Sequence, residues 1–186
     1  VSDLTKGIRE EVISDLVDLH IPPDSMEEQW DIPALEHQLE AEFRLSADIR
    51  SWLEADNTLD GQDIKERLID RIETEYAEKT ELVGKKPMAD FERNVMLQVI
   101  DTQWREHLAA MDYLRQGIHL RSYAQKNPKQ EYKREAFAMF ENLWRGIKQN
   151  IASLLVSVQI ERNTVPEEME ERTPTDIHAT RSEEHT

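Results

Sequence analysis

The chain of 186 residues contains no cysteine and only five glycines. Without cysteine it can form no disulfide, no thiolate zinc site and no cysteine nucleophile. Its glycines lie too far apart for a glycine-rich phosphate loop, which excludes a Walker A motif and a dinucleotide-binding fingerprint. The longest apolar stretch, residues 151–158, is far shorter than the ~20 residues that span a bilayer. No secretory signal opens the chain, so we expect a cytosolic protein.

Charge is distributed unevenly along the sequence. The total is −16, of which residues 1–90 carry −14, residues 91–160 carry +3 and residues 161–186 carry −5. Affinity for polyphosphate comes mainly from Lys and Arg, so an acidic chain of this kind predicts no nucleic-acid partner. A local basic site in the middle segment remains compatible with these charges.

The first half of the chain has the apolar spacing of short helices. A first helix should end near His20, before two prolines. Ser25 and Glu28 have the spacing of a capping box, and Asp31 is placed to cap a second helix. A further stripe with i, i+4 spacing should end at Gly84, followed by Pro87. The stripe consists of Ile64, Leu68, Ile72 and Tyr76.

From about Met88 the helical pattern becomes much longer. Apolar residues advance by three or four as far as Ile118, and again from Tyr132 to Val158. Asn127 and Pro128 are an N-cap with proline at the first helical position. Two long helices joined by a turn of about ten residues should pack as an antiparallel hairpin.

The sequence therefore predicts an all-α fold in three parts. Residues 1–86 form a small helical domain, residues 87–160 the long antiparallel hairpin, and residues 161–186 a disordered acidic linker tail. The tail is expected to be disordered because it has almost no large apolar residues. No alternation typical of β-strands persists along the chain.

Several groups of reactive side chains are better explained as structure. No Glu stands three residues before a His, so the di-iron motif is missing and we expect no metal site. We expect His107 on a helix surface and His119 in a turn. The carboxylates Asp101, Glu106 and Asp112 are expected on a solvated helix face. Four aromatic residues follow the apolar stripes and are expected in the core. They are Trp104, Phe137, Phe140 and Trp144.

The turn between the long helices is the strongest candidate site. Residues 115–134 carry a net charge of +5. The cations are Arg115, Arg121, Lys126, Lys129, Lys133 and Arg134. Tyr123 lies off both helical registers, at the expected tip of the hairpin. Two interpretations remain open, a solvated turn with Tyr123 packed back onto the helices or an aromatic probe that touches a partner.

The same region resembles the SecA family, the motor subunits of bacterial preprotein translocase. The resemblance rests on the runs Met96–Arg121 and Tyr123–Glu135, with Ile21-Pro22-Pro23 and Trp30–Pro33 upstream. It covers about residues 1–160. It implies that residues 1–86 are similar to the helical wing domain and that the hairpin is similar to the two-helix finger of the helical scaffold domain. In the family this finger also regulates the ATPase.

The resemblance also implies roles and partners. In the family the tip of the finger enters the mouth of the SecY channel, and its tyrosine contacts the unfolded preprotein. That role carries over to Tyr123, flanked by Arg121 and Lys126. Further implied partners are the remaining SecA motor domains and, through the whole protein, acidic phospholipid at the cytoplasmic membrane. ATP and Mg²⁺ would bind in the other motor domains, and the family's C-terminal zinc motif needs cysteines that this chain lacks.

Two further expectations follow from the resemblance. The finger normally packs along a scaffold helix that we expect to be missing here. Its apolar faces should then be partly uncovered, and isolated chains could self-associate. The alternative function is a freestanding helical adaptor for other proteins, with no coupling to ATP and no catalytic activity. Phosphate-loop and motor motifs encoded upstream of Val1 would favour the translocase, whereas a start codon there would favour the adaptor.

Overall fold

The computed structural model describes residues 1–118, 120 and 127–161. Every regular element in these ranges is a helix, which confirms the all-α prediction. The elements are α1 (Ser2–His20), the 3₁₀ turn η1 (Glu27–Gln29), α2 (Ile32–Phe43), α3 (Ile49–Ala55), α4 (Gly61–Val83), α5 (Lys85–Gly117) and α6 (Pro128–Ser157). The predicted tail lies outside the described residues from residue 162 onward.

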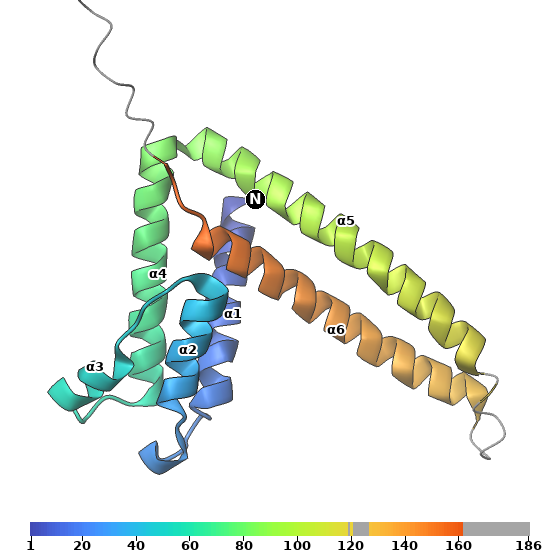
Figure 1. The fold of residues 1–186 in the computed structure, drawn as a ribbon, viewed down its shortest axis with the longest axis horizontal. Helices are drawn as coiled ribbons and strands as arrows, with labels where there is room; N and C mark the ends of the chain where they lie inside the picture. The colour runs from blue at the N-terminus through green and yellow to red at the C-terminus, as the bar shows by residue number, and fades with distance from the viewer. Residues whose placement is uncertain (119, 121–126, 162–186) are drawn as a thin grey trace, which may run out of the picture.

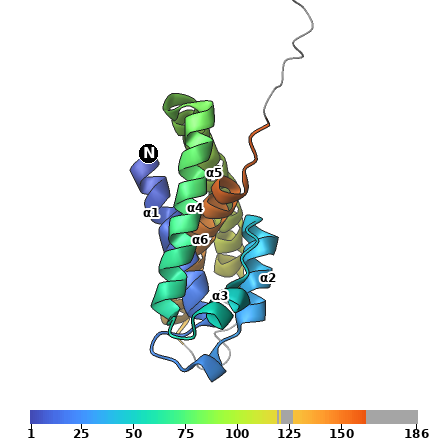
Figure 2. The same ribbon diagram turned by 90° about the vertical axis from the view of Figure 1, so that its left-hand side faces the viewer.

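The long hairpin is the dominant feature of the shape. Helices α5 and α6 run antiparallel and project together from a cluster formed by α1, α2 and α4 (Figure 1). Viewed from the side, α6 enters this cluster beside α1, whereas the first turns of α5 lie at the C-terminal end of α4 (Figure 2). The predicted helical hairpin is therefore confirmed. The proposed boundary at residues 86 and 87 stays a prediction.

The hydrophobic core lies where the hairpin meets the short helices. Its fully buried apolar side chains come from α1, α2, α3, α4 and α6. Each of these helices therefore needs the others to bury its apolar face. The largest are Ile13, Leu35, Leu39, Phe43, Ile49, Ile64, Leu68, Ile151 and Leu155. Helix α5 adds Met88, Val95 and Val99 to the edge of the same cluster. The core thus holds the base of the hairpin against the acidic first half of the chain.

Three predicted caps are present at helix ends. Asp31 accepts a hydrogen bond from the Ala34 amide at 3.1 Å and starts α2. Asn127 accepts from the Lys129 amide at 3.1 Å and starts α6. Gly84 ends α4 with φ 95°, a left-handed value that strongly favours glycine.

One local prediction is wrong, and one short helix was missed. Ser25 is not part of a capping box, because its hydroxyl bonds to the Pro22 carbonyl and accepts from the Trp30 indole. Pro87 follows the end of α4 as predicted and also lies in the first turn of α5, where its missing amide costs no hydrogen bond. The short helix α3 was not predicted, although Asp48 caps it by accepting from the Ser51 amide at 3.2 Å.

Candidate functional site

The basic end of the hairpin is only partly described. Arg121, Tyr123 and Lys126 lie outside the described residues, as does His119. On the described side, the turn begins where α5 ends at Gly117 and finishes where α6 starts at Pro128. The predicted length of the connection is therefore confirmed, and the aromatic role of Tyr123 stays a prediction.

Four predicted cations flank this turn on exposed helix surface. Arg115 pairs with Asp112 at 2.8 Å, and Arg134 pairs with Glu131 at 2.6 Å. The other two are Lys129 and Lys133, which are exposed and form no ion pair with the described residues. Exposed pairs of this kind contribute little to stability. These pairs also neutralise the positive charge of the two arginines. Most of the unpaired positive charge near the turn on the described helices is therefore on Lys129 and Lys133.

A polar contact joins the two helices of the hairpin midway along their length. The Gln103 side chain donates a hydrogen bond to the Gly146 carbonyl at 3.1 Å. A Cβ at residue 146 would come within 2.9 Å of the Gln103 amide oxygen. Gly146 therefore leaves room for the end of the Gln103 side chain, a contact that the sequence pattern did not reveal.

His107 lies beside this seam and differs from its prediction. It is half-buried rather than on an open helix surface. Its ring centroid is 5.5 Å from that of Trp104 and 6.4 Å from that of Phe140. By contrast, Asp101 and Asp112 are exposed and paired with arginines, and Glu106 is exposed, as predicted for a solvated helix face.

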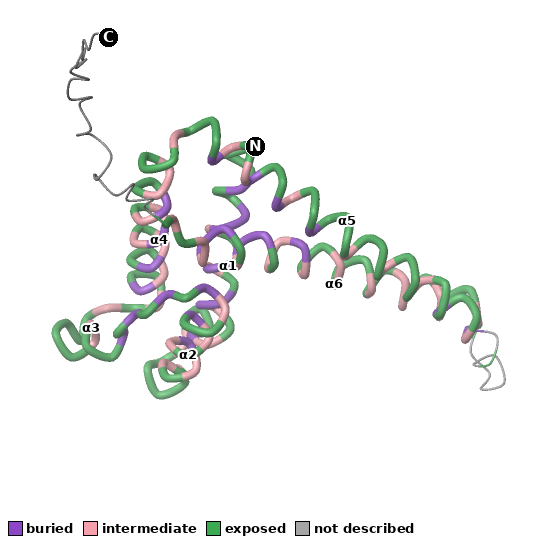
Figure 3. Tube along the Cα trace, turned by 45° about the horizontal axis from the view of Figure 1, so that its top comes forward, coloured by how far each residue is buried: buried purple, intermediate pink, exposed green. Residues whose placement is uncertain are grey.

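The four aromatic residues expected in the core are exposed, so that prediction is wrong. Trp104 is 46% exposed, Phe140 and Trp144 are 53% exposed, and Phe137 is 64% exposed. They form an apolar stripe along the outer hairpin together with Leu97, Ile100 and Leu108. Figure 3 shows the buried residues collected near α1, α2 and α4, and mostly exposed residues along the outer hairpin. The expectation of partly uncovered hairpin faces is confirmed.

A groove of about 440 Å³ extends this stripe toward α1. Leu4 of α1, Ile100 of α5 and Trp144 of α6 line it, and all three side chains are exposed. Exposed apolar surface of this extent typically marks an interaction site. The stripe and the groove together are a candidate interaction surface on the described hairpin.

The base of α6 is anchored by polar contacts as well as by the core. The Ser153 hydroxyl donates to the Glu42 carbonyl at 2.6 Å, and the Gln149 amide donates to the Glu42 carboxylate at 2.6 Å. Lys79 of α4 donates to the Val156 carbonyl at 3.0 Å. Burial lowers the pKa of the Lys79 ammonium, partly offset by Glu75. The anchor thus ties the last turns of α6 to both α2 and α4.

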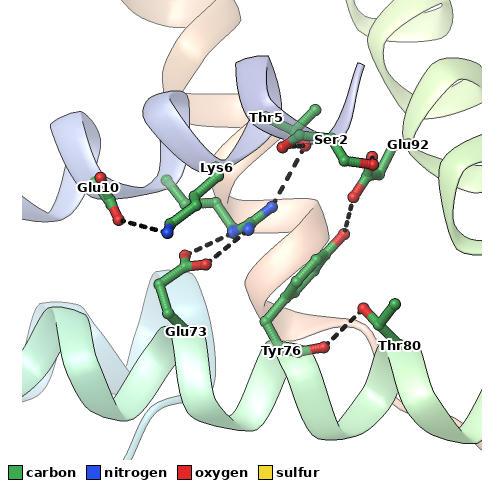
Figure 4. A network of polar contacts seen from close by, with 9 residues as sticks. Ser2, Thr5, Lys6, Glu10, Glu73, Tyr76, Thr80 and Glu92 are labelled. Atoms are coloured by element: carbon green, nitrogen blue, oxygen red, sulfur yellow. Dashed lines mark hydrogen bonds and ion pairs between the residues drawn. The ribbon is translucent and has the colours of Figure 1, made fainter. Parts of the chain in front are cut away.

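A second polar cluster holds the base of α5 (Figure 4). The Glu92 carboxylate accepts from Tyr76 Oη and from Ser2 Oγ, each at 2.9 Å. Arg9 lies 3.7 Å from the centre of the Tyr76 ring and forms two 2.8 Å hydrogen bonds with Glu73. Burial, followed by the bond to Glu92, raises the pKa of the Tyr76 hydroxyl, so it remains a donor.

The described residues contain no cluster of metal-ligating side chains. In residues 1–118, 120 and 127–161 no group of three or more His, Asp or Glu side chains could hold a metal ion. None of the helices in these ranges is long and apolar enough to cross a bilayer. The glycines of this chain belong to helices or helix ends, so they do not fit a phosphate loop for ATP.

Comparison with known proteins identifies the family. Residues 1–159 match the family described as SecA Wing and Scaffold domain. The protein translocase subunit SecA of Neisseria meningitidis serogroup A is 79% identical over 165 residues, covering 89% of this chain and 18% of the relative. The SecA subunit of Nitrosococcus oceani is 54% identical over 160 residues, and that of Chromobacterium violaceum is 52% identical over 160 residues. Each of these two matches covers 86% of this chain and 18% of the relative. The chain belongs to the SecA wing and scaffold domain family.

Proposed function

We propose that this chain is the wing and two-helix finger of a SecA protein translocase motor. The observation that carries the proposal is the hairpin itself, anchored at one end in the core and projecting at the other. Helix α5 has 33 residues, which corresponds to about 50 Å of rigid length. A helix pair of this size can pass a small movement at its base to a distant tip. The finger therefore acts as a lever without catalytic groups of its own.

The tip of this lever contacts the translocating preprotein at the mouth of the SecY channel. Tyr123 touches the unfolded chain, because an aromatic ring can contact many side chains without strict sequence demands. Arg121 and Lys126 flank it, and the exposed Lys129 and Lys133 extend the positive surface along α6. Positive charge at this end favours docking on an acidic or carbonyl-lined partner.

The apolar stripe contacts the rest of the motor. The chain spans 18% of the length of its SecA relatives, so most of such a protein lies outside it. Packing of other domains on Trp104, Phe140 and Trp144 would cover the exposed side chains and couple the finger to nucleotide turnover. ATP and Mg²⁺ bind in those domains, and the assembled motor works at the cytoplasmic face of the membrane with acidic phospholipid. Self-association through the same stripe competes with this packing in the isolated chain.

Replacement of the tip tyrosine in the full-length relative tests the proposal. Tyr123→Ala is expected to reduce preprotein translocation into SecY-containing vesicles by about tenfold, the range of a lost aromatic contact. Basal ATP hydrolysis should change far less, because the tip is remote from the nucleotide. Tyr113→Ala is the matched control, since Tyr113 is 81% exposed on α5 outside the turn.

The outcomes are distinct. Loss of translocation in Tyr123→Ala alone supports a contact made by the tip. Equal translocation by the parent and both variants, with unchanged folding by circular dichroism, removes Tyr123 from the mechanism. Equal loss in both variants would indicate that the hairpin contributes a general surface rather than a specific probe.

A further inference from the structure

The junction between α4 and α5 is a single residue. Gly84 donates its amide to the Thr80 carbonyl at 2.8 Å, and its own carbonyl accepts from the Met88 amide at 3.1 Å. Gly84 therefore closes the last turn of α4 and opens the first turn of α5. Its φ of 95° allows the chain to change direction there without a loop. Rotation at this residue would change the direction in which α5 leaves α4.

Few side chains hold the first turns of α5 against the neighbouring helices. Met88 contributes apolar contact, and Glu92 lies one turn further along with only 2% of its surface exposed. A buried carboxylate is costly unless its oxygens are hydrogen-bonded. Both oxygens of Glu92 are satisfied, one by Tyr76 of α4 and the other by Ser2 of α1. Glu92 thus joins three helices at one point.

The donor from α4 is itself fixed in place. Arg9 stacks on the Tyr76 ring and is held by the two oxygens of Glu73. A planar guanidinium bound at two points has a defined orientation. The ring of Tyr76 therefore cannot turn easily, and its hydroxyl stays directed at Glu92 (Figure 4).

The two helices of the hairpin depend on different anchors at their bases. Helix α6 is held by buried apolar side chains, including Ile151 and Leu155, and by the contacts to Glu42. Helix α5 buries its apolar side chains less completely, with Met88 4% and Val95 8% exposed, and adds the polar cluster to them. Hydrogen bonds weaken steeply when their geometry changes, whereas apolar contacts are not directional and tolerate small shifts. The base of α5 is therefore the part of the hairpin that can be released separately.

We propose that Ser2, Arg9, Tyr76 and Glu92 form a latch that fixes the angle of α5 about the Gly84 pivot. With the latch closed, the direction of the outer hairpin is set. With the latch open, α5 rotates about Gly84 while the base of α6 stays in the core. At about 50 Å from the pivot, a rotation of about 10° displaces the end of α5 by about 9 Å. The latch sets the direction of α5 independently of which partner contacts the tip of the hairpin.

Distances between spin labels can test this latch directly in the 186-residue chain. The chain has no cysteine, so labels can be attached to introduced cysteines alone. Glu78→Cys on α4 with Ala109→Cys on α5 reports the direction of α5. Glu78→Cys with Asn150→Cys on α6 reports the anchor of α6. All three positions are exposed.

The test variant is Tyr76→Phe combined with Ser2→Ala, which removes both donors to Glu92 and keeps the aromatic ring under Arg9. We expect the α4–α5 distance distribution to shift or broaden by several ångström and the α4–α6 distribution to stay narrow. Tyr113→Phe is the matched control and should change neither distribution, because Tyr113 is exposed on α5.

Two results would overturn the latch. The first is an α4–α5 distribution that stays as narrow as in the parent chain although the variant is folded. The second is equal broadening of both distributions, which would indicate general loosening of the core. Glu92→Gln provides an independent variant, since its amide nitrogen cannot accept one of the two hydrogen bonds. It should broaden only the α4–α5 distribution, and to a smaller extent than the double variant.

Discussion

The core region around the base of the hairpin and the outer half of the hairpin share an apolar periodicity but have different surroundings. In both regions apolar residues recur every three or four positions, as in an amphipathic helix. At the base, Ile147, Ile151 and Leu155 are buried against α1 and α2. In the outer half, Trp104, Phe140 and Trp144 are about half exposed. The period of a helix predicts which residues share a face and does not say whether a partner covers that face.

An ion pair in the core region is also largely buried, whereas one in the outer hairpin is exposed. Arg9 is 3% exposed and is bound at two points by Glu73. Arg105 pairs with Asp101 in the outer hairpin with both side chains largely in water. The exposed pair is worth little because water and salt screen it. The buried pair fixes geometry, because losing one partner would leave a charge without compensation.

The largest expected contrast between the regions is in the cost of removing a phenylalanine. Phe43→Ala should lower the free energy of unfolding by about 3–5 kcal/mol, because Phe43 is 1% exposed and its loss leaves a cavity. Phe140→Ala should cost less than about 0.5 kcal/mol, because this ring is already half exposed. Urea titrations followed by circular dichroism measure both values. Similar costs for the two variants would show that the stripe is covered in solution, and sedimentation velocity would then reveal self-association.

Glycine substitutions should give the next largest contrast. A Cβ at Gly61 would lie 2.7 Å from the branched methyl of buried Ile21, so Gly61→Ala should cost about 1–3 kcal/mol. A Cβ at Gly117 would meet nothing within 4 Å. Gly117→Ala should therefore be neutral or stabilising by up to about 1 kcal/mol, since alanine favours helix. Thermal unfolding of the two variants checks the order, and destabilisation by Gly117→Ala would contradict an open hairpin end.

The smallest contrast concerns alkaline pH. The pKa of the Tyr76 hydroxyl is raised in the folded chain, so above pH 10.0 the unfolded state loses this proton first. Stability should then fall as pH rises, by about 1.4 kcal/mol per pH unit for this one group. Tyr76→Phe removes that loss, so the stability difference between parent and variant should narrow between about pH 9 and about pH 11. Urea titrations at the two pH values measure it, and Tyr113→Phe should leave the profile of the parent unchanged.

Much of the local structure could be predicted because it depends on neighbours in sequence. Asp31 and Asn127 cap helices through amides two or three residues away, and Gly84 ends α4 through its own backbone. Ser25 was mispredicted because its hydroxyl donates to the Pro22 carbonyl and accepts from the Trp30 indole, so it does not cap the following turn. Pro87 both follows the end of α4, as predicted, and lies in the first turn of α5, because proline is tolerated at the start of a helix.

The candidate site was predictable only in part. Charge counting located the basic turn, and the resemblance supplied a role for Tyr123. The exposed stripe could not be separated from a core face by pattern alone, since aromatic residues have the same spacing in both. The contacts of Glu92 with Ser2 and Tyr76 span 90 and 16 residues. No local pattern places an acidic residue in such a cluster.

By itself the sequence determined every α-helix except α3, several of the helix ends, the family and the uneven charge. These properties follow from side-chain periodicity, from capping over a few residues and from composition, all of which act along the chain. Only the tertiary structure decided which apolar faces are buried and how α5 is held beside α1 and α4. Burial and polar pairing depend on segments that are distant in sequence, so they exist only once the helices have packed.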